Sequence, residues 1–259
     1  MTRTVGIVQA RTGSTRLPGK VLKPLGGDTA LFQVLRRVAA IPALESVVCA
    51  TSDRPEDDVI ATEAKRCGAE VYRGSLDDVL TRYLGAAKMA NADVILRVTS
   101  DCPLIDPDVC GEVIALRASS DADFATNNTP PGFPVGLDCE TFTLDALERA
   151  ERDAKDTIER EHVTPWLRTN SDVRHANLDG PGGRFVEQRW TLDYPEDYAF
   201  FAALFDALPP PPEIPGWRDV FATVMGDAEL SRLQERCRRV AVEHQQNASE
   251  GRLENAQEA

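Results

Sequence analysis

Runs of β-forming residues alternate with amphipathic stretches through the first part of the chain, and this alternation limits the fold more than any other feature. The β-rich runs are residues 4–10, 46–51, 70–73 and 93–99, and helical patterns lie between them at 31–41, 55–67 and 77–90. Strands joined through helices pair in parallel, because each helix returns the chain to the same end of the sheet. The sequence therefore predicts an α/β fold, in which helices cover both faces of a mostly parallel sheet.

The alternation of strand and helix patterns becomes less regular in the second half of the chain. Residues 127–183 read as a loop followed by helices at 144–153 and from about Thr157, and a strand at 185–192 and a helix at 195–208 follow a glycine-rich turn. Prolines from Pro209 onward cannot continue that helix. We expect a domain over 1–208, a linker at 209–216, and a helical appendage over 217–259 with a disordered tail beyond Asn247.

Composition excludes several classes of partner. The formal net charge is -13, so the overall field repels phosphate backbones and anionic membranes, and we expect no nucleic-acid partner. No apolar run reaches the roughly 18 residues that a membrane-spanning helix needs. The six cysteines include no closely spaced pair, which is typical of a reduced, cytoplasmic protein.

The segment that follows the first predicted strand has the composition of a phosphate-binding loop. Residues 11–20 read RTGSTRLPGK, and they place Arg11, Arg16 and Lys20 beside glycines and hydroxyl groups. Glycine lets backbone N–H groups approach an anion, while the cations neutralise its charge. The spacing differs from the Walker A pattern. Ligands of parallel sheets collect at the carboxyl ends of strands, so this loop predicts a nucleoside triphosphate site.

Aspartates follow two further predicted strands. Asp101 comes directly after the strand at 94–99, and Asp193 comes after the strand predicted at 185–192. Mg²⁺ takes one or two protein carboxylates together with substrate phosphate oxygens, which makes this pair a candidate metal site. The alternative is that each aspartate caps the helix that follows it. Asp106, before Pro107, is assigned only such a capping role.

Residues 8–20 resemble the first motif of the cytidylyltransferases that activate acylneuraminate and 3-deoxy-manno-octulosonate sugars, most closely the spore coat polysaccharide biosynthesis branch. The resemblance runs from about residue 4 to 208. It implies a Rossmann-like nucleotide-diphosphosugar transferase fold, catalytic roles for Arg11, Lys20, Asp101 and Asp193, and Mg²⁺ on the two aspartates. Gln9 stands where the sugar-specific families usually carry proline. The implied nucleotide contacts are Ala10, Arg11, Gly13, Ser14, Thr15, Arg16, Lys20, Arg73 and Ser100.

Three later segments, residues 73–83, 134–140 and 160–166, also resemble motifs of that branch. Within the first, Arg73 is the candidate contact to the base, while Ser75 and the two aspartates after it suit a helix start. The candidate acceptor-binding residues are Asp138, Glu140, Arg160, His162 and Arg189. For His162 a purely structural role is the alternative.

The reaction implied by the resemblance is CTP plus an anionic acceptor, such as a sugar acid, giving the CMP-acceptor and pyrophosphate. The resemblance also implies a homodimer, with residues 127–183 as the acceptor and dimerisation region. Alternatives are an enzyme of the same fold that uses another nucleotide or a phosphate or phosphonate acceptor, and a non-catalytic nucleotide-binding scaffold. A glycosyltransferase is disfavoured because Ser100-Asp101 does not form the Asp-x-Asp metal motif.

Overall fold

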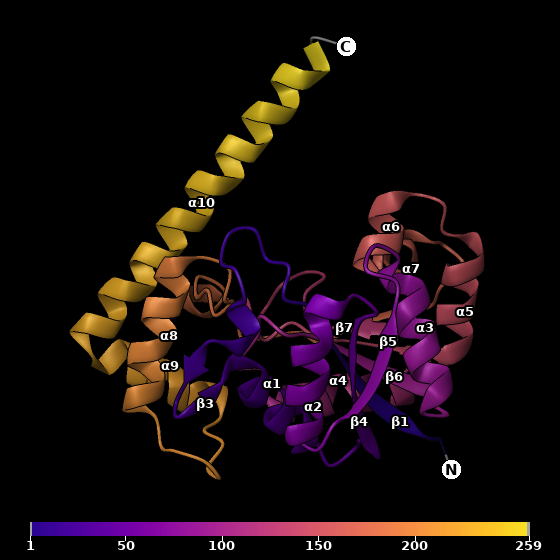
Figure 1. Cartoon of the computed structure of the whole chain (residues 1–259), viewed down its shortest axis with the longest axis horizontal. Coiled ribbons are helices and arrows are strands. Elements are labelled where there is room, and N and C mark those ends of the chain that lie inside the picture. Colours follow the sequence, from indigo (N-terminus) through magenta and orange to yellow (C-terminus); the bar gives the residue numbers. More distant parts are fainter. Residues whose placement is uncertain (1, 258–259) are drawn as a thin grey trace.

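A seven-stranded sheet forms the centre of the computed structural model, which describes residues 2–257 and their side chains as far as Asn247 (Figure 1). Its strand order is β5-β4-β1-β6-β8-β7-β9. Strands β1 (Thr4–Gln9), β4 (Ser46–Ser52), β5 (Glu70–Gly74) and β6 (Val94–Thr99) are parallel. β8 (Glu140–Thr143) runs antiparallel to β6 and to β7 (Phe124–Thr126), and β9 (His175–Asn177) closes the edge. The predicted α/β fold is confirmed.

Helices cover both faces of this sheet. α3 (Val79–Met89) and α5 (Leu144–Asp153) pack on one face, against side chains such as Ile7 and Ile95. The other face carries α1 (Ala30–Ala39), α2 (Asp58–Arg66) and α4 (Pro107–Ser119), packed against Val8 and Leu96. Alternate residues of β1 and β6 therefore enter different cores, and both strands are buried on both sides.

Residues 127–183 supply two strands of the sheet, β8 and β9, which the sequence does not indicate. They also form α5, α6 (Thr157–His162) and α7 (Pro165–Thr169). Asp156 caps α6, since its side chain accepts from the N–H of Ile158 and the side chain of Glu159 reaches back to it. This segment places α6 beside α3, above the carboxyl ends of the central strands.

The strand predicted at 185–192 is not formed. The structure has a 3₁₀ turn, η3 (Gly183–Phe185), and then irregular chain that makes one bridge, between Val135 and Arg189. Trp190, in the middle of this segment, is fully buried, and its ring N–H donates to Oε1 of Gln234. The segment is thus held by side-chain burial under the C-terminal helices rather than by a ladder of strand pairing.

The C-terminal helices share a core with the sheet domain. α8 (Pro195–Ala207), α9 (Trp217–Gly226) and α10 (Ala228–Gln257) enclose an apolar cluster that also contains Leu17 and Trp190. The buried carboxylate of Asp106 caps α4, as predicted, and its other oxygen accepts the backbone N–H of Trp217 at 2.7 Å. The predicted C-terminal helices are present, and the segment 209–216 leads into them from α8, with which they share this core.

α10 continues past the point where the sequence predicts disorder. Its backbone is helical to Gln257, and Figure 1 shows it extending beyond the body of the molecule, whereas residues 258–259 lie outside the described part. The stretch from Asn247 has good helix formers and no proline. Among the described residues, no helix combines the length and apolar content that crossing a bilayer demands.

Candidate functional site

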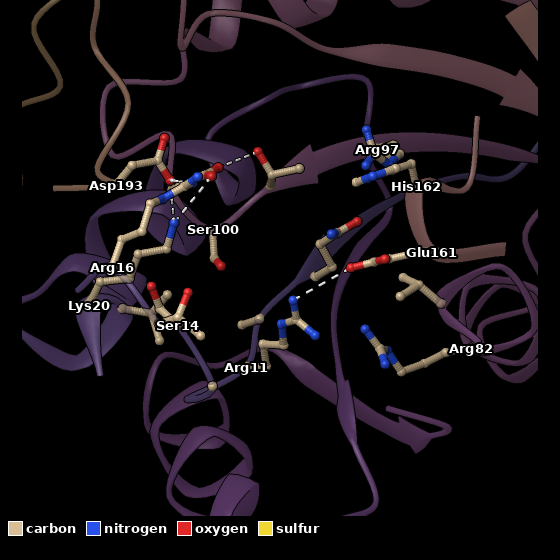
Figure 2. Close-up of a pocket in the computed structure, with 18 residues that line it drawn as sticks. Arg11, Ser14, Arg16, Lys20, Arg82, Arg97, Ser100, Glu161, His162 and Asp193 are labelled. Atoms are coloured by element: carbon tan, nitrogen blue, oxygen red, sulfur yellow. Dashed lines mark hydrogen bonds and ion pairs between the residues drawn. The ribbon is translucent and has the colours of Figure 1, made fainter. Parts of the chain in front are cut away.

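A cavity of about 490 Å³ opens at the carboxyl ends of β1 and β6, the sheet edge that the sequence singles out (Figure 2). The loop at 11–20 forms one wall, and the turn after β6 forms another. α3 and α6 contribute the remaining walls. Lys20, Arg16 and Asp193 lie at one end, Arg97 and His162 lie at the other, and Arg11 lies between them.

The loop at 11–20 is fixed by a carboxylate that sequence reasoning missed. Asp57 is buried, and its Oδ1 accepts both the backbone N–H and the hydroxyl of Thr12 at 2.7 Å. Burial alone would raise the pKa of Asp57, but hydrogen bonds from Ser52 and Thr12 outweigh it and lower the pKa. Gly19 has a φ of 64°, a left-handed conformation that glycine adopts without strain. The loop is therefore held in shape before any ligand binds.

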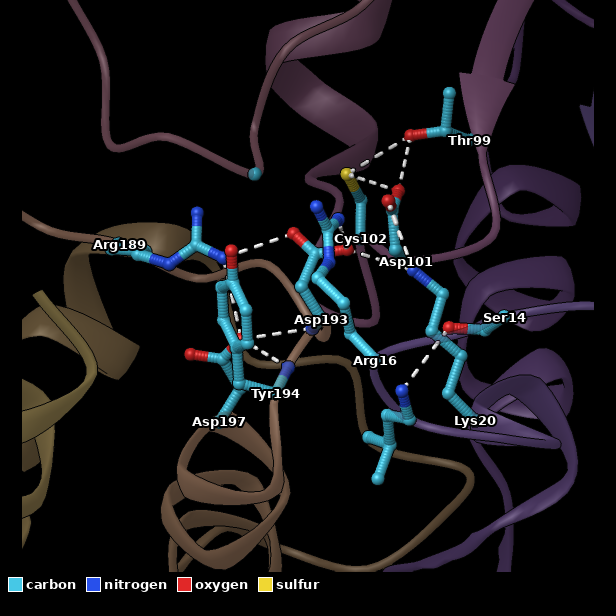
Figure 3. A network of polar contacts seen from close by, with 12 residues as sticks. Ser14, Arg16, Lys20, Thr99, Asp101, Cys102, Arg189, Asp193, Tyr194 and Asp197 are labelled. Atoms are coloured by element: carbon cyan, nitrogen blue, oxygen red, sulfur yellow. Dashed lines mark hydrogen bonds and ion pairs between the residues drawn. The ribbon is translucent and has the colours of Figure 1, made fainter. Parts of the chain in front are cut away.

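Lys20 joins the two candidate metal aspartates (Figure 3). Its Nζ lies 2.9 Å from Oδ1 of Asp193 and 3.3 Å from Oδ2 of Asp101. Burial alone would lower the pKa of Lys20, but the charges of Asp101 and Asp193 outweigh this effect and raise it. The ammonium group is therefore held in its charged form between two carboxylates.

Asp193 is paired with two further cationic side chains besides Lys20. Its Oδ1 also accepts from Arg16 at 3.2 Å, and its Oδ2 accepts from Arg189 at 2.9 Å. Burial alone would raise the pKa of Asp193, but Lys20 and Arg189 outweigh it and lower the pKa to about 2. Asp197 fixes the backbone here, since its Oδ2 accepts the N–H groups of Asp193 and Tyr194. A helix-capping role, the alternative for Asp193, belongs to Asp197 instead.

Most of the residues predicted to contact nucleotide line this cavity. They are Ala10, Arg11, Gly13, Ser14, Thr15, Arg16, Lys20 and Ser100, together with Asp101 and Asp193. Arg73 does not line it. Its guanidinium donates to the carbonyls of Ser52 and Arg54 and pairs with Asp58, so it braces the chain that follows β4.

Of the five predicted acceptor-binding residues, only His162 lines the cavity. Arg160, two residues before it, bonds to Asp78 and to Glu151 and so ties α6 to α3 and α5. Arg189 is held on Asp193. Arg160 and Arg189 are thus paired with carboxylates of the protein, and neither lines the cavity.

Glu140 is buried and Asp138 is partly buried, and neither lines the cavity. Asp138 accepts the backbone N–H of Gly136 at 3.1 Å, and burial raises its pKa. Glu140 is paired with Arg97 at 2.7 Å and with Arg168, and Thr164 donates to it. Burial alone would raise the pKa of Glu140, but Arg97 and Arg168 outweigh it and lower the pKa. Glu140 therefore orients Arg97, which does reach the cavity.

Several cavity residues had no assigned role in the sequence analysis. They are Gln9, Val21, Val79, Arg82, Arg97, Thr99 and Glu161. Arg97 carried a signal, since it is the one charged residue of an otherwise apolar strand and stands near the carboxyl end of that strand. Glu161 lies beside His162 in the same motif, and its carboxylate faces Arg11 at 3.8 Å. Arg82 gave no comparable signal, because arginine inside a helix is ordinary.

The Asp101 and Asp193 pair suits a divalent cation bound together with phosphate. No group of three or more His, Cys, Asp or Glu side chains in the described part of the chain could hold a metal ion by itself. Mg²⁺ does not need such a group, because it takes one or two carboxylates and completes its shell with phosphate oxygens and water. Both carboxylates already hold one cationic group, Lys20, so a shared cation fits their placement.

Comparison with known proteins agrees with this geometry. The sequence model of the cytidylyltransferase family matches residues 5–198. An uncharacterized protein of Methanocaldococcus jannaschii is 37% identical over 204 residues, which is 78% of this chain and 83% of that protein. The spore coat polysaccharide biosynthesis protein SpsF of Bacillus subtilis is 32% identical over 215 residues, 80% of this chain and 88% of that protein.

A solved structure extends the agreement to three dimensions. A cytidylyltransferase from Leptospira borgpetersenii has a TM-score of 0.82 and 31% sequence identity, and the alignment covers 90% of this chain and 98% of that one. The family match at residues 5–198 includes both Asp101 and Asp193. The resemblance drawn from the sequence motifs is confirmed: the chain is a nucleotidyltransferase enzyme that belongs to the cytidylyltransferase family.

Proposed function

We propose that this enzyme transfers CMP from CTP to an anionic acceptor, a sugar acid or a related molecule, with release of pyrophosphate. The observation that carries the proposal is the arrangement of Lys20, Asp101 and Asp193 at one end of a cavity whose wall is a cationic, glycine-containing loop. That combination offers a place for phosphates and a place for a divalent cation side by side. Family membership supports cytidine as the nucleoside.

The loop cations would hold the triphosphate and stabilise the leaving group. Arg11, Arg16 and Lys20 all line the cavity, so they can neutralise charge that builds on the β- and γ-phosphates as the bond to the α-phosphorus breaks. Asp101 and Asp193 would hold Mg²⁺. When bound, the ion would withdraw charge from phosphate oxygens and favour attack by the acceptor.

The far end of the cavity would receive the acceptor. Arg97 and His162 both line the cavity at this end (Figure 2), and Arg97 is oriented by the buried Glu140. Glu140 is shared by Arg97 and Arg168, so the group of three side chains keeps one unit of positive charge. A carboxylate on the acceptor would balance this charge. The name of the Bacillus subtilis relative supports a product used in surface polysaccharide biosynthesis.

The cysteines bear on the compartment in which the reaction takes place. All six cysteines are free, and five of them are buried, which supports a reducing compartment such as the cytoplasm. A homodimer, with part of 127–183 at the interface, remains our proposal for the assembly. Sedimentation of the purified chain tests it.

A pyrophosphate-release assay tests the function. CTP, UTP, GTP and ATP would each be offered with Mg²⁺ and with sugar acids, sugar phosphates or phosphonates. The proposal expects turnover with CTP and an acceptor that carries a carboxylate. If the enzyme prefers another nucleotide, or a phosphate or phosphonate acceptor, the proposed substrate is wrong but the proposed site is retained. No turnover together with tight nucleotide binding would favour a non-catalytic scaffold.

A further inference from the structure

Lys20 occupies the position between the two carboxylates that a divalent cation needs. We propose that Lys20 is the internal counter-ion of Asp101 and Asp193, and that it releases them to a divalent cation only when phosphate oxygens take up its ammonium group. This inference rests on the phosphate loop and the metal pair of the proposed function. It adds that metal binding and triphosphate binding depend on each other.

The oxygens concerned are already engaged. Oδ2 of Asp101 and Oδ1 of Asp193 both accept from the same Nζ, at 3.3 and 2.9 Å. Oδ1 of Asp101 accepts from the hydroxyl of Thr99 at 2.5 Å. The oxygens that face each other are therefore those that Lys20 holds, and they are the oxygens that one shared cation would bind.

The ammonium group and a metal ion cannot occupy this position together. Mg²⁺ binds carboxylate oxygen at about 2.1 Å, closer than the 2.9 and 3.3 Å at which Nζ lies, so an ion shared by both aspartates would crowd the space that Nζ now fills. Lys20 is largely buried, with 14% of its side chain exposed, and a second cation beside it would be repelled at short range with little screening by solvent. Binding of the ion therefore requires Lys20 to move.

The loop itself supplies the means of that movement. Both groups on Oδ1 of Asp193, Lys20 and Arg16, belong to the segment at 11–20 that would bind the triphosphate. The group on Oδ2, Arg189, comes from another segment and does not line the cavity. A triphosphate on the loop would draw Lys20 and Arg16 away together. It would thereby free the oxygen that faces Asp101 and leave Arg189 holding the carboxylate in place.

Lys20 thus acts as a positioning residue for the metal site before substrate arrives. It prevents repulsion between Asp101 and Asp193, and it keeps their oxygens turned toward one point. The consequence is positive coupling, in which the metal binds weakly alone and tightly once a triphosphate is present.

Mn²⁺ binding without nucleotide tests the counter-ion role directly. The loss of the free Mn²⁺ signal in electron paramagnetic resonance would be followed for the wild type, Lys20→Met and Lys20→Gln. Both variants should bind Mn²⁺ about tenfold or more tightly than the wild type, within the usual range of coupling between sites. Combining Lys20→Met with Asp193→Asn should remove the gain.

Two control variants separate this role from a general loss of charge. Lys23→Met removes a nearby lysine that lies over the Tyr198 ring outside the cavity, and it should leave Mn²⁺ binding unchanged. Lys20→Arg keeps a cation at the position and should bind Mn²⁺ as weakly as the wild type.

If neither Lys20→Met nor Lys20→Gln, each with a folded circular dichroism spectrum, binds Mn²⁺ more tightly than the wild type, the inference is overturned. Because these titrations use no nucleotide, they are independent of the choice of CTP. Failure of CTP turnover with the Mn²⁺ result intact would reject the proposed substrate and retain the counter-ion role.

Discussion

Nζ of Lys20 lies 2.9 Å from Oδ1 of Asp193, although 173 positions separate the two residues in the chain. The contact joins the loop at 11–20, which follows β1, to the turn before α8, and Asp101 at the end of β6 completes it. The sheet brings β1 and β6 together in parallel register, with Gln9 opposite Thr99. Packing of α8 against the loop then brings the third segment to the same point.

Asp193→Asn tests how much this contact stabilises the fold. Because the pKa of Asp193 is about 2 in the folded protein and near 3.9 in an unfolded chain, its charge stabilises the fold above about pH 4. That contribution, about 2–3 kcal/mol, falls away as the pH drops from about 4 to 2. Urea unfolding of wild type and Asp193→Asn should show a difference in free energy that shrinks over this window. A difference that stays constant from pH 6 to pH 2 would contradict the assignment.

Arg160→Ala and His162→Ala should separate structural from ligand-binding roles within one motif. Arg160 bonds to Asp78, Thr81 and the carbonyl of Glu151, so its loss should lower the free energy of unfolding by about 1–3 kcal/mol. His162 faces the cavity, so its loss should raise the KM of the acceptor and change stability little. Steady-state kinetics and urea unfolding of both variants check this division. The reverse pattern would restore Arg160 to the acceptor site.

Trp217→Ala tests whether the C-terminal helices belong to the main core. Trp217 is 5% exposed and packs edge-on against Phe133 and Phe185, so its truncation should cost about 3–5 kcal/mol. Met225→Ala, at a half-exposed position of the same helix, is the matched control and should cost less than about 1 kcal/mol. Equal effects of the two substitutions would show that α9 is an independent appendage.

The sequence predicts the part of the site that depends on local order along the chain. The loop at 11–20 and Asp101 each follow a central strand, and the carboxyl ends of parallel strands meet at one edge. Those residues were found because their position relative to a strand decides where they lie. Asp193 was singled out by the strand predicted before it, which is absent, and by the resemblance to the family's pair of metal-binding aspartates.

The acceptor side depends on contacts between distant segments, which the sequence does not display. Arg160 and Glu140 read as free polar groups, yet Asp78 pairs with the first, and Arg97 and Arg168 pair with the second. Pairing of this kind arises when α6 docks on α3 and β8 pairs with β6. Only Arg97, a charge inside an apolar strand, could have been singled out beforehand.

Pyrophosphate release from CTP by wild type and Asp101→Asn is the most direct test of the account. With Mg²⁺ and a sugar acid that the wild type accepts, Asp101→Asn should lower kcat/KM by about 100-fold or more, because it removes a carboxylate that we propose holds Mg²⁺ at the reacting phosphate. Asp108→Asn, an exposed aspartate on α4, should behave as the wild type. The account is contradicted if Asp101→Asn releases pyrophosphate from CTP at the wild-type rate. It is also contradicted if the wild type releases no pyrophosphate from CTP with any acceptor offered.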